Sequence, residues 1–319
     1  MPHTAKLSAI PVNQGHADFA ARVHFNAMAC GCEIVASLPT HAASKSAVDA
    51  AIAEVRRIES KFSRYRDDSI VSIINAAAGK AAVACDDETW ELLELADRFY
   101  CDSDGLFDIT AGVLRRAWDF KQACLPEPVH LATLLACVGW PRVERHAQFV
   151  RLQAGMEMDF GGFGKEYAVD RAAMLLESLG VDHGYVNLGG DVRVIGPKPD
   201  GQPWTFGIRD PRNPGALVAT IPLSRGGLAT SGDYERYFEL DGVRYCHILD
   251  ARSGWPVNHS RSVSVIAATA VMAGQVSTIA MLKQAQGLEY LKSTGLRYFS
   301  IDQHGTISFS PKASGGEAL

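Results

Sequence analysis

The stretch between residues 157 and 191 constrains the fold most strongly, because two glycine turns enclose one helix and one strand there. Apolar residues recur at helical spacing over residues 167–179, and Gly180 suits the end of that helix. Residues 185–188 predict a strand that runs into the second turn. Glycines let a ligand approach the backbone closely, and Lys165 adds a cation at the helix start. The pattern therefore favours a phosphate-bearing ligand.

The rest of the chain mixes helices and strands in a way that indicates a single α+β domain. Helices are expected at 46–62, from Asp86 or Asp87 to residue 100, and at 271–283. Strands are expected at 33–38, 192–195, 205–209, 217–223, 227–231, 236–240, 243–248, 262–267, 296–301 and 307–309, with Asp241-Gly242 turning a hairpin. Residues 119–145 are predicted to be irregular because they contain three prolines.

The domain is expected to be compact, with mixed or antiparallel sheets flanked by helices, and to span residues 23–311. Neither an internal repeat nor a linker divides it. Residues 1–22 are predicted to be a loose lead-in, and residues 312–319 a loose tail. The 319 residues are 47% hydrophobic, which is enough to bury a substantial core.

Charge and cysteine content exclude several classes of function. The net charge of −5 gives no electrostatic footprint for nucleic acid, and no apolar run predicts a transmembrane segment. Neither a signal peptide nor a lipobox is visible, so the sequence as given predicts a cytoplasmic protein, or a periplasmic one if a leader has been removed. The seven cysteines include one close pair, Cys30 and Cys32, and are interpreted as reduced thiols, since no second pair completes a zinc site.

Single motifs leave the chemistry open. The first glycine turn begins like a dinucleotide fingerprint, but Tyr167 stands where the third glycine belongs. Residues 230–234 form either a hydroxyl-lined loop near a phosphate or a simple turn. His247 is either a catalyst or a structural strand-end residue, and Asp108 and Asp159 are either functional carboxylates or caps. No Ser/His/Asp or Cys/His nucleophile system can be resolved.

Six blocks in order, from Met28 to Leu282, nevertheless resemble the ApbE-type flavin transferases, the FAD:protein FMN transferases. The first four blocks are Met28-Ala29-Cys30, Phe62-Ser63-Arg64-Tyr65 with Asp68-Ser69, Gly105-Leu106-Phe107-Asp108-Ile109-Thr110, and the opening stretch with Asp159, Lys165, Asp170 and Gly189-Gly190-Asp191. The last two are Ala229-Thr230-Ser231-Gly232-Asp233-Tyr234 and His247-Ile248-Leu249-Asp250 with Gly254 and Pro256.

This resemblance implies an enzyme that binds FAD and moves its FMN half onto a threonine or serine hydroxyl of an acceptor protein, releasing AMP. The step is expected to depend on a divalent metal, Mg²⁺. An FAD pyrophosphatase that yields FMN and AMP, and a non-catalytic FAD-binding relative, are the alternatives. The resemblance assigns His247 and Lys165 to catalysis, and it assigns Met28, Tyr65, Leu106, Phe107, Asp108, Asp159, Lys165, Asp170, Thr230, Ser231, Gly232 and Leu249 to the FAD cleft.

The metal site implied by the resemblance departs from the family pattern in this chain. A carbonyl at Gly162 and the hydroxyl of Thr278 are retained, but Gly274 stands where the family has an aspartate. Glu166 stands where the family has a glycine. Because Mg²⁺ depends on carboxylate ligands, Glu166 is the candidate replacement. The alternative interpretation of Glu166 is a solvent-facing glutamate that the helix dipole favours.

Overall fold

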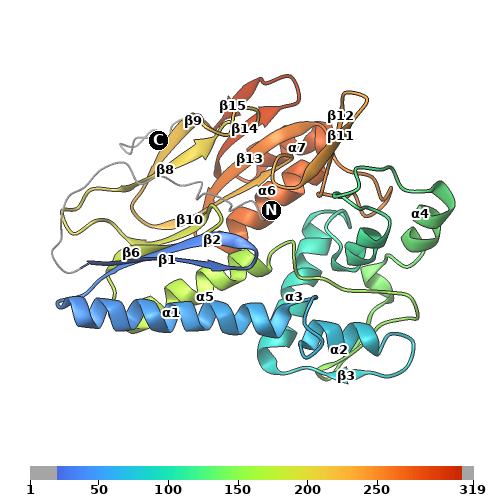
Figure 1. Ribbon diagram of the computed structural model, residues 1–319, viewed down its shortest axis with the longest axis horizontal. Helices are drawn as coiled ribbons and strands as arrows, with labels where there is room; N and C mark the ends of the chain where they lie inside the picture. Colours follow the sequence, from blue (N-terminus) through green and yellow to red (C-terminus); the bar gives the residue numbers. More distant parts are fainter. Residues whose placement is uncertain (1–19, 311–319) are drawn as a thin grey trace.

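The computed structural model describes residues 20–310, and its centre is one eight-stranded sheet in which every neighbouring pair of strands is antiparallel (Figure 1). The strand order is β1-β2-β6-β7-β10-β13-β14-β15. The strands are β1 (Ala20–Ala27), β2 (Cys30–Ser37), β6 (His183–Leu188), β7 (Asp191–Gly196), β10 (Gly226–Gly232), β13 (Ser260–Ala267), β14 (Arg297–Asp302) and β15 (Ile307–Phe309). The predicted α+β class is confirmed. Residues 1–19 of the predicted lead-in and the predicted tail at 312–319 lie outside the described residues.

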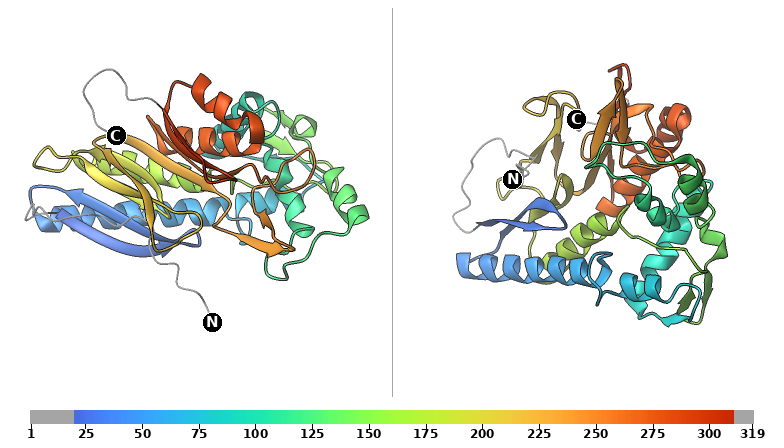
Figure 2. Two further views of the ribbon diagram at one scale, coloured as in Figure 1. Left: turned by 90° about the horizontal axis from the view of Figure 1, so that it is seen from above. Right: turned by 45° about the vertical axis from the view of Figure 1, so that its right-hand side comes forward.

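Three helices cover one face of the sheet: α1 (His41–Phe62), α5 (Gly164–Ser178) and α6 (Ala270–Leu282). The α1 helix packs on β1 and β2, α5 on β6 and β7, and α6 on β10 and β13. The α1 and α5 helices lie side by side along this face (Figure 2). The predicted apolar stripe of α1 is buried there, and the Thr40 side chain caps its first turn. Packing of such stripes against the sheet forms the main core.

The hairpin of β8 (Trp204–Arg209) and β9 (Leu217–Leu223) forms a separate two-stranded sheet. Its apolar side chains join a second core cluster with side chains from β2, β6, β7 and β10. Tyr185 of β6 anchors this cluster, because its ring packs edge-on against Trp204 and Phe206 at centroid distances of 4.9 and 5.3 Å.

A mainly helical lobe lies beyond the C-terminal end of α1 (Figure 1). It contains α2 (Ile70–Ala76), α3 (Asp87–Asp102), η1 (Ile109–Arg116), α4 (Pro128–Leu135) and η2 (Trp140–Arg142), with a small sheet of β3 (Val83–Ala84), β4 (Glu144–His146) and β5 (Phe149–Arg151). Asp86 caps α3, as predicted. The prediction that residues 119–145 are irregular is wrong for α4. A proline suits the first helical position, and the Glu127 side chain caps it.

The remaining elements are the hairpin of β11 (Tyr237–Leu240) and β12 (Val243–Cys246), followed late in the chain by η3 (Gln284–Gln286) and α7 (Gly287–Ser293). Asp241 and Gly242 both have positive φ, as the predicted two-residue hairpin turn requires. Met28 and Ala29 adopt the same left-handed conformation between β1 and β2. This first hairpin escaped prediction because neither residue is a usual turn former, and β1 takes in residues 20–22 of the predicted lead-in.

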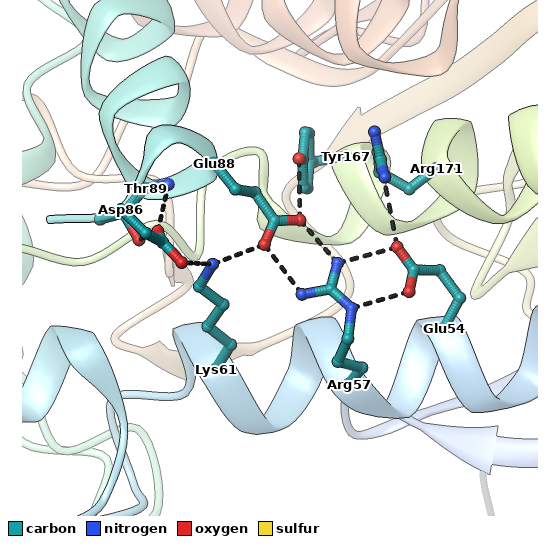
Figure 3. A network of polar contacts seen from close by, with 8 residues as sticks. All are labelled: Glu54, Arg57, Lys61, Asp86, Glu88, Thr89, Tyr167 and Arg171. Carbon is teal, nitrogen blue, oxygen red and sulfur yellow. Dashed lines mark hydrogen bonds and ion pairs between the residues drawn. The ribbon is translucent and has the colours of Figure 1, made fainter.

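An ionic network joins α1, α3 and α5 on the outside of the core (Figure 3). Its members are Glu54, Arg57, Lys61, Asp86, Glu88, Thr89, Tyr167 and Arg171. Arg57 donates to Glu54 at 2.7 Å and to Glu88 at 2.6 Å, and Lys61 donates to Glu88 at 2.6 Å. We call this set the helix network. Because opposite charges alternate along it, it locks the start of α5 to the two neighbouring helices.

Candidate active site

The glycine turn before α5 is held in place by side chains from two other segments. Asp159 pairs with Arg64 and accepts a hydrogen bond from the Gly161 amide at 2.9 Å. A Cβ on Gly162 would lie 2.8 Å from the ring of Phe107, so only glycine fits at this point. Among residues 20–310, no side chain caps the N-terminus of α5. The Gly164 amide donates to the Phe160 carbonyl at 2.7 Å, and the Glu166 amide donates to its own carboxylate, so this turn attracts an anionic ligand mainly through the positive end of the helix dipole.

Lys165, in the first turn of α5, is paired with Asp191, the first residue of β7. The two charged groups are 2.7 Å apart, and the Asp191 side chain is only 4% exposed. Burial alone would lower the pKa of Lys165, but the carboxylates of Asp191 and Glu166 raise it above its ordinary value. Asp191 also accepts a bond from the Thr230 amide at 3.3 Å. A permanent cation is thus fixed where α5, β7 and β10 meet.

Glu166 does not face solvent, so that alternative interpretation of it is wrong. The residue is 8% exposed and its side chain lies over Gly274 of α6, because α5 and α6 pack closely. Burial, followed by the nearby charge of Asp191, raises the pKa of Glu166 to about 8. Thr278 lies one turn further along α6, with its hydroxyl 2.9 Å from that of Ser231 on β10.

His247 directly follows β12, and its amide donates to the Arg236 carbonyl at 3.0 Å. The residue is exposed on one side, yet partial burial by the surrounding protein and then the charge of Arg236 lower its pKa to about 4. The positive charge of Lys165 acts in the same direction. Since the imidazole is neutral at neutral pH, it can accept a proton.

Tyr65 connects the glycine turn with the His247 segment. Its hydroxyl accepts a hydrogen bond from Arg64 at 2.8 Å, and Arg236 also bonds it. Tyr65 is 73% exposed. Contacts thus link the α1–α2 loop, through Tyr65 and Arg236, to the segment of His247. Near the first turn of α5, the cation of Lys165 is fixed by Asp191 of β7.

Comparisons with known proteins identify the family of the chain. The ApbE family model matches residues 28–299. This chain belongs to the ApbE family. It is 32% identical over 278 residues to the FAD:protein FMN transferase of Treponema pallidum, with 76% of this chain and 77% of that protein covered. It is 28% identical to a FAD:protein FMN transferase of Klebsiella pneumoniae over 312 residues, with 92% and 96% covered.

Two solved structures share the fold. The crystal structure of the ApbE protein from Thermotoga maritima matches with a TM-score of 0.84 and 32% identity, over 91% of this chain and 97% of that one. The apo form of the Pseudomonas stutzeri flavinyl transferase ApbE matches with a TM-score of 0.81 and 28% identity, over 91% and 94%. The agreement of family model, sequence and structure makes the assignment to the ApbE family secure.

Several residues that the ApbE resemblance assigns to FAD are committed to the protein itself. Asp108 caps η1 and accepts from the amides of Thr110 and Trp140. Asp170 accepts from the first two amides of α6, both at 2.9 Å, and its pKa is raised by burial. Phe107 is buried against aromatic rings. Asp108 and Asp170 thereby hold distant backbone segments together, and Phe107 lies against Gly162 of the glycine turn.

The other residues predicted for the FAD cleft lie on several different segments. Met28 occupies the β1–β2 turn, where its amide donates to Glu59 at 2.5 Å. Leu106 packs against the main core, and Leu249 packs against a small cluster under η1. Thr230, Ser231 and Gly232 end strand β10, so the strand predicted at 227–231 is confirmed and the loop or turn interpretation of residues 230–234 is wrong for these three. Thr230 also lines a pocket together with Gly189, Gly190, Tyr234 and residues 206–209 of β8.

Sequence reasoning did not select Asp191, Arg236 or Cys30 as site residues. Asp191 ends the block Gly189-Gly190-Asp191, so the sequence did offer an acidic side chain there that could have been selected. The Cys30 sulfur lies 3.8 Å from that of Cys32. The hydrogen bond with Cys32 lowers the pKa of Cys30, burial raises it, and the charge of Lys165 lowers it, so the pKa is lowered overall. Arg236 gave no signal, because its role depends on packing next to Tyr65.

Within the part of the chain that the structure describes, no group of three or more His, Cys, Asp or Glu side chains could hold a metal ion. Hydroxyl, carbonyl and ligand oxygens would therefore have to complete any cation site. None of the helices within residues 20–310 has the length and apolar character to cross a membrane.

Proposed function

We propose that this protein transfers the FMN moiety of FAD to a threonine or serine hydroxyl of an acceptor protein. The hydroxyl oxygen attacks the phosphorus of the FMN half, the bond from that phosphorus to the bridging oxygen breaks, and AMP leaves. The observation that carries the proposal is the cation of Lys165, fixed by Asp191 in the first turn of α5. The names of the ApbE relatives support the same reaction.

The groups around α5 suit the breaking of a pyrophosphate. The ammonium group of Lys165 can bind phosphate oxygens, and together with the positive end of the α5 dipole it can stabilise the charge that develops on them. The neutral imidazole of His247 can take the proton of the attacking hydroxyl, because its pKa of about 4 keeps it unprotonated at neutral pH. A divalent cation such as Mg²⁺ would supply further neutralisation of the phosphate charge.

The FAD molecule needs contacts beyond its phosphates, and the site offers both polar and apolar ones. The exposed ring of Tyr65 and the apolar side chains of Leu249 and Met28 can contact the ring systems of FAD. The hydroxyls of Thr230 and Ser231 can bind its polar groups. Asp108, Asp159 and Asp170 act through the backbone segments that they hold.

Mass spectrometry tests the proposal directly. The protein is incubated with FAD, Mg²⁺ and a candidate acceptor protein that carries a threonine or serine site, and the acceptor mass and released nucleotides are measured. We expect the acceptor to gain the mass of one FMN, with one AMP released per transfer. Release of AMP and free FMN without modification of any acceptor would contradict transfer and favour hydrolysis. Absence of FAD binding in calorimetry would contradict both activities.

A further inference from the structure

The carboxylate of Glu166 occupies the space that a side chain at position 274 would fill. An ideal Cβ on Gly274 would lie 2.7 Å from Oε1 of Glu166 and 2.8 Å from its Cγ. Real Cβ atoms do not approach other atoms so closely, so the Glu166 side chain can keep this position only with glycine at position 274. The identities of Glu166 and Gly274 therefore depend on each other.

The Glu166 carboxylate is buried without a partner from elsewhere in the protein. Within residues 20–310, the hydrogen bond that it accepts comes from its own amide, and no ion pair joins it to a basic side chain. The neighbouring ammonium of Lys165 is committed to Asp191 at 2.7 Å. A buried carboxylate without a cation or several donors is costly in free energy. Its position therefore indicates a positively charged ligand.

The groups beside Glu166 supply oxygen atoms. Thr278 follows Gly274 by four residues, so it lies on the same face of α6, toward Glu166. Its hydroxyl is 2.9 Å from that of Ser231, which in turn is 2.8 Å from that of Ser277. Carboxylate and hydroxyl oxygens suit a hard cation, and Mg²⁺ usually combines one or two protein carboxylates with substrate phosphates. The residues present therefore fit such an ion when FAD phosphates are bound beside it.

We propose that Glu166, seated over Gly274, provides the protein carboxylate for a divalent cation, so that in this chain the carboxylate comes from α5 and α6 supplies the Thr278 hydroxyl. The inference rests on the proposed function, because the phosphates of FAD complete the ligand set. It assigns Gly274 a steric role: the absent side chain leaves room for the carboxylate.

Binding of Mn²⁺ as a probe, followed by electron paramagnetic resonance of the free ion, tests the inference without an activity assay. With saturating FAD, we expect Glu166→Gln to weaken Mn²⁺ binding by at least about 10–100-fold, because loss of even an outer-shell partner of a metal ligand costs that much. FAD affinity without metal should stay within about twofold of that of the wild type. Glu177→Gln is the matched control, because Glu177 is a partly exposed residue of the same helix, and this variant should bind Mn²⁺ normally.

A carboxylate exchange tests the steric half of the inference. Gly274→Asp alone should lower the melting temperature by about 3–6 °C, because the new side chain overlaps Glu166. The double variant Glu166→Gly with Gly274→Asp should regain both the melting temperature and Mn²⁺ binding, since one carboxylate again occupies the shared space. Met272→Asp, on the exposed face of the same helix, is the control and should change neither property.

Wild-type Mn²⁺ affinity in Glu166→Gln would overturn the inference, as would a stable Gly274→Asp variant with an unchanged melting temperature. These failures can be distinguished from failure of the proposed function. Transfer of FMN by a protein whose Mn²⁺ binding ignores Glu166 would overturn only the ligand assignment. Mn²⁺ binding that depends on Glu166, without FMN transfer to any acceptor, would confirm the ligand and overturn the transferase proposal.

Discussion

The charged clusters on the two faces of α5 differ in whether they favour the ionised form of their carboxyl groups. Tyr167 and Arg171 point into the helix network, where acids and bases alternate and the pKa of Glu88 is lowered to about 2. Lys165 and Glu166 point into the candidate active site, where the pKa of Glu166 is raised to about 8. The network stabilises ionised acids, whereas the site holds one acid for which ionisation is unfavourable.

The cause of this difference is the number of partners. Glu88 accepts from Arg57, Lys61 and Tyr167, so its charge is fully compensated although only 18% of its side chain is exposed. Glu166 is more deeply buried, and within residues 20–310 the hydrogen bond that its carboxylate accepts comes from its own amide. Ionisable groups with shifted pKa values and no compensating partner are typical of functional sites, whereas networks in which every charge is paired stabilise the fold. One side of α5 therefore contributes to the stability of the fold through the helix network, and the other side faces the candidate active site.

The largest effect is expected at His247. If it accepts the proton of the acceptor hydroxyl, His247→Ala should reduce turnover by about 10²–10⁴-fold and leave FAD affinity nearly unchanged. His304→Ala, in an exposed turn, is the control. Because the pKa of His247 is lowered to about 4, the active neutral form persists in mildly acidic solution, and kcat/KM should fall only as the pH drops through about 4. Ordinary turnover of His247→Ala would make it a structural residue.

Removing the site cation should affect both activity and stability. Lys165→Met is expected to reduce turnover by about 10²–10³-fold, the usual result of losing one group that stabilises transition-state charge. It should also destabilise the fold by about 3 kcal/mol, the lower end for a broken buried pair, since the Lys165 side chain is 32% exposed. Adding Asp191→Asn should recover much of the stability and none of the activity, as enzyme assays and urea unfolding can measure. If Lys165→Met were as active as the wild type, Lys165 would serve stability alone, like the members of the helix network.

In the helix network, the same kind of change should affect stability alone. Arg57→Met leaves Glu54 and Glu88 close together without their shared cation, and we expect a loss of about 1–2 kcal/mol with unchanged FMN transfer. The folded-state pKa of Glu88, about 2, lies below its unfolded value of about 4.3. Its stabilisation is therefore present above pH 4.3 and lost as the pH falls toward 2.

Unfolding titrations of wild type and Arg57→Met at several pH values measure this directly. The difference in unfolding free energy should narrow as the pH falls from about 5 to about 2. A constant difference over that range would show that Arg57 contributes through packing of its aliphatic part and not through its charge.

The smallest effect is expected where charges are fully open to water. Lys45 and Asp49 form a pair one turn apart on α1, with side chains 51% and 54% exposed. Lys45→Met should change the unfolding free energy by no more than about 0.5 kcal/mol and leave activity unaltered. A loss as large as that in Arg57→Met would mean that partner number and burial do not explain the network.

Local sequence determined much of the scaffold. The apolar stripe of α1, the Asp86 cap of α3 and the Asp241-Gly242 turn each act within a few residues, so periodicity and turn chemistry predicted them. Ordered blocks also marked Lys165 and His247, although nothing in the spacing of the two residues shows that they approach each other. Tight turns without glycine, such as Met28-Ala29, were missed because only the pairing of β1 with β2 holds them.

The roles of the carboxylates were decided by tertiary structure alone. Asp108 and Asp170 are predicted to border FAD, and the structure adds that each accepts a hydrogen bond from a backbone amide of a distant segment. Glu166 and Gly274 are far apart in the sequence, and their mutual fit exists only because α5 packs on α6. A carboxylate is defined chemically by the donors that surround it, and those donors are fixed only when distant segments come together.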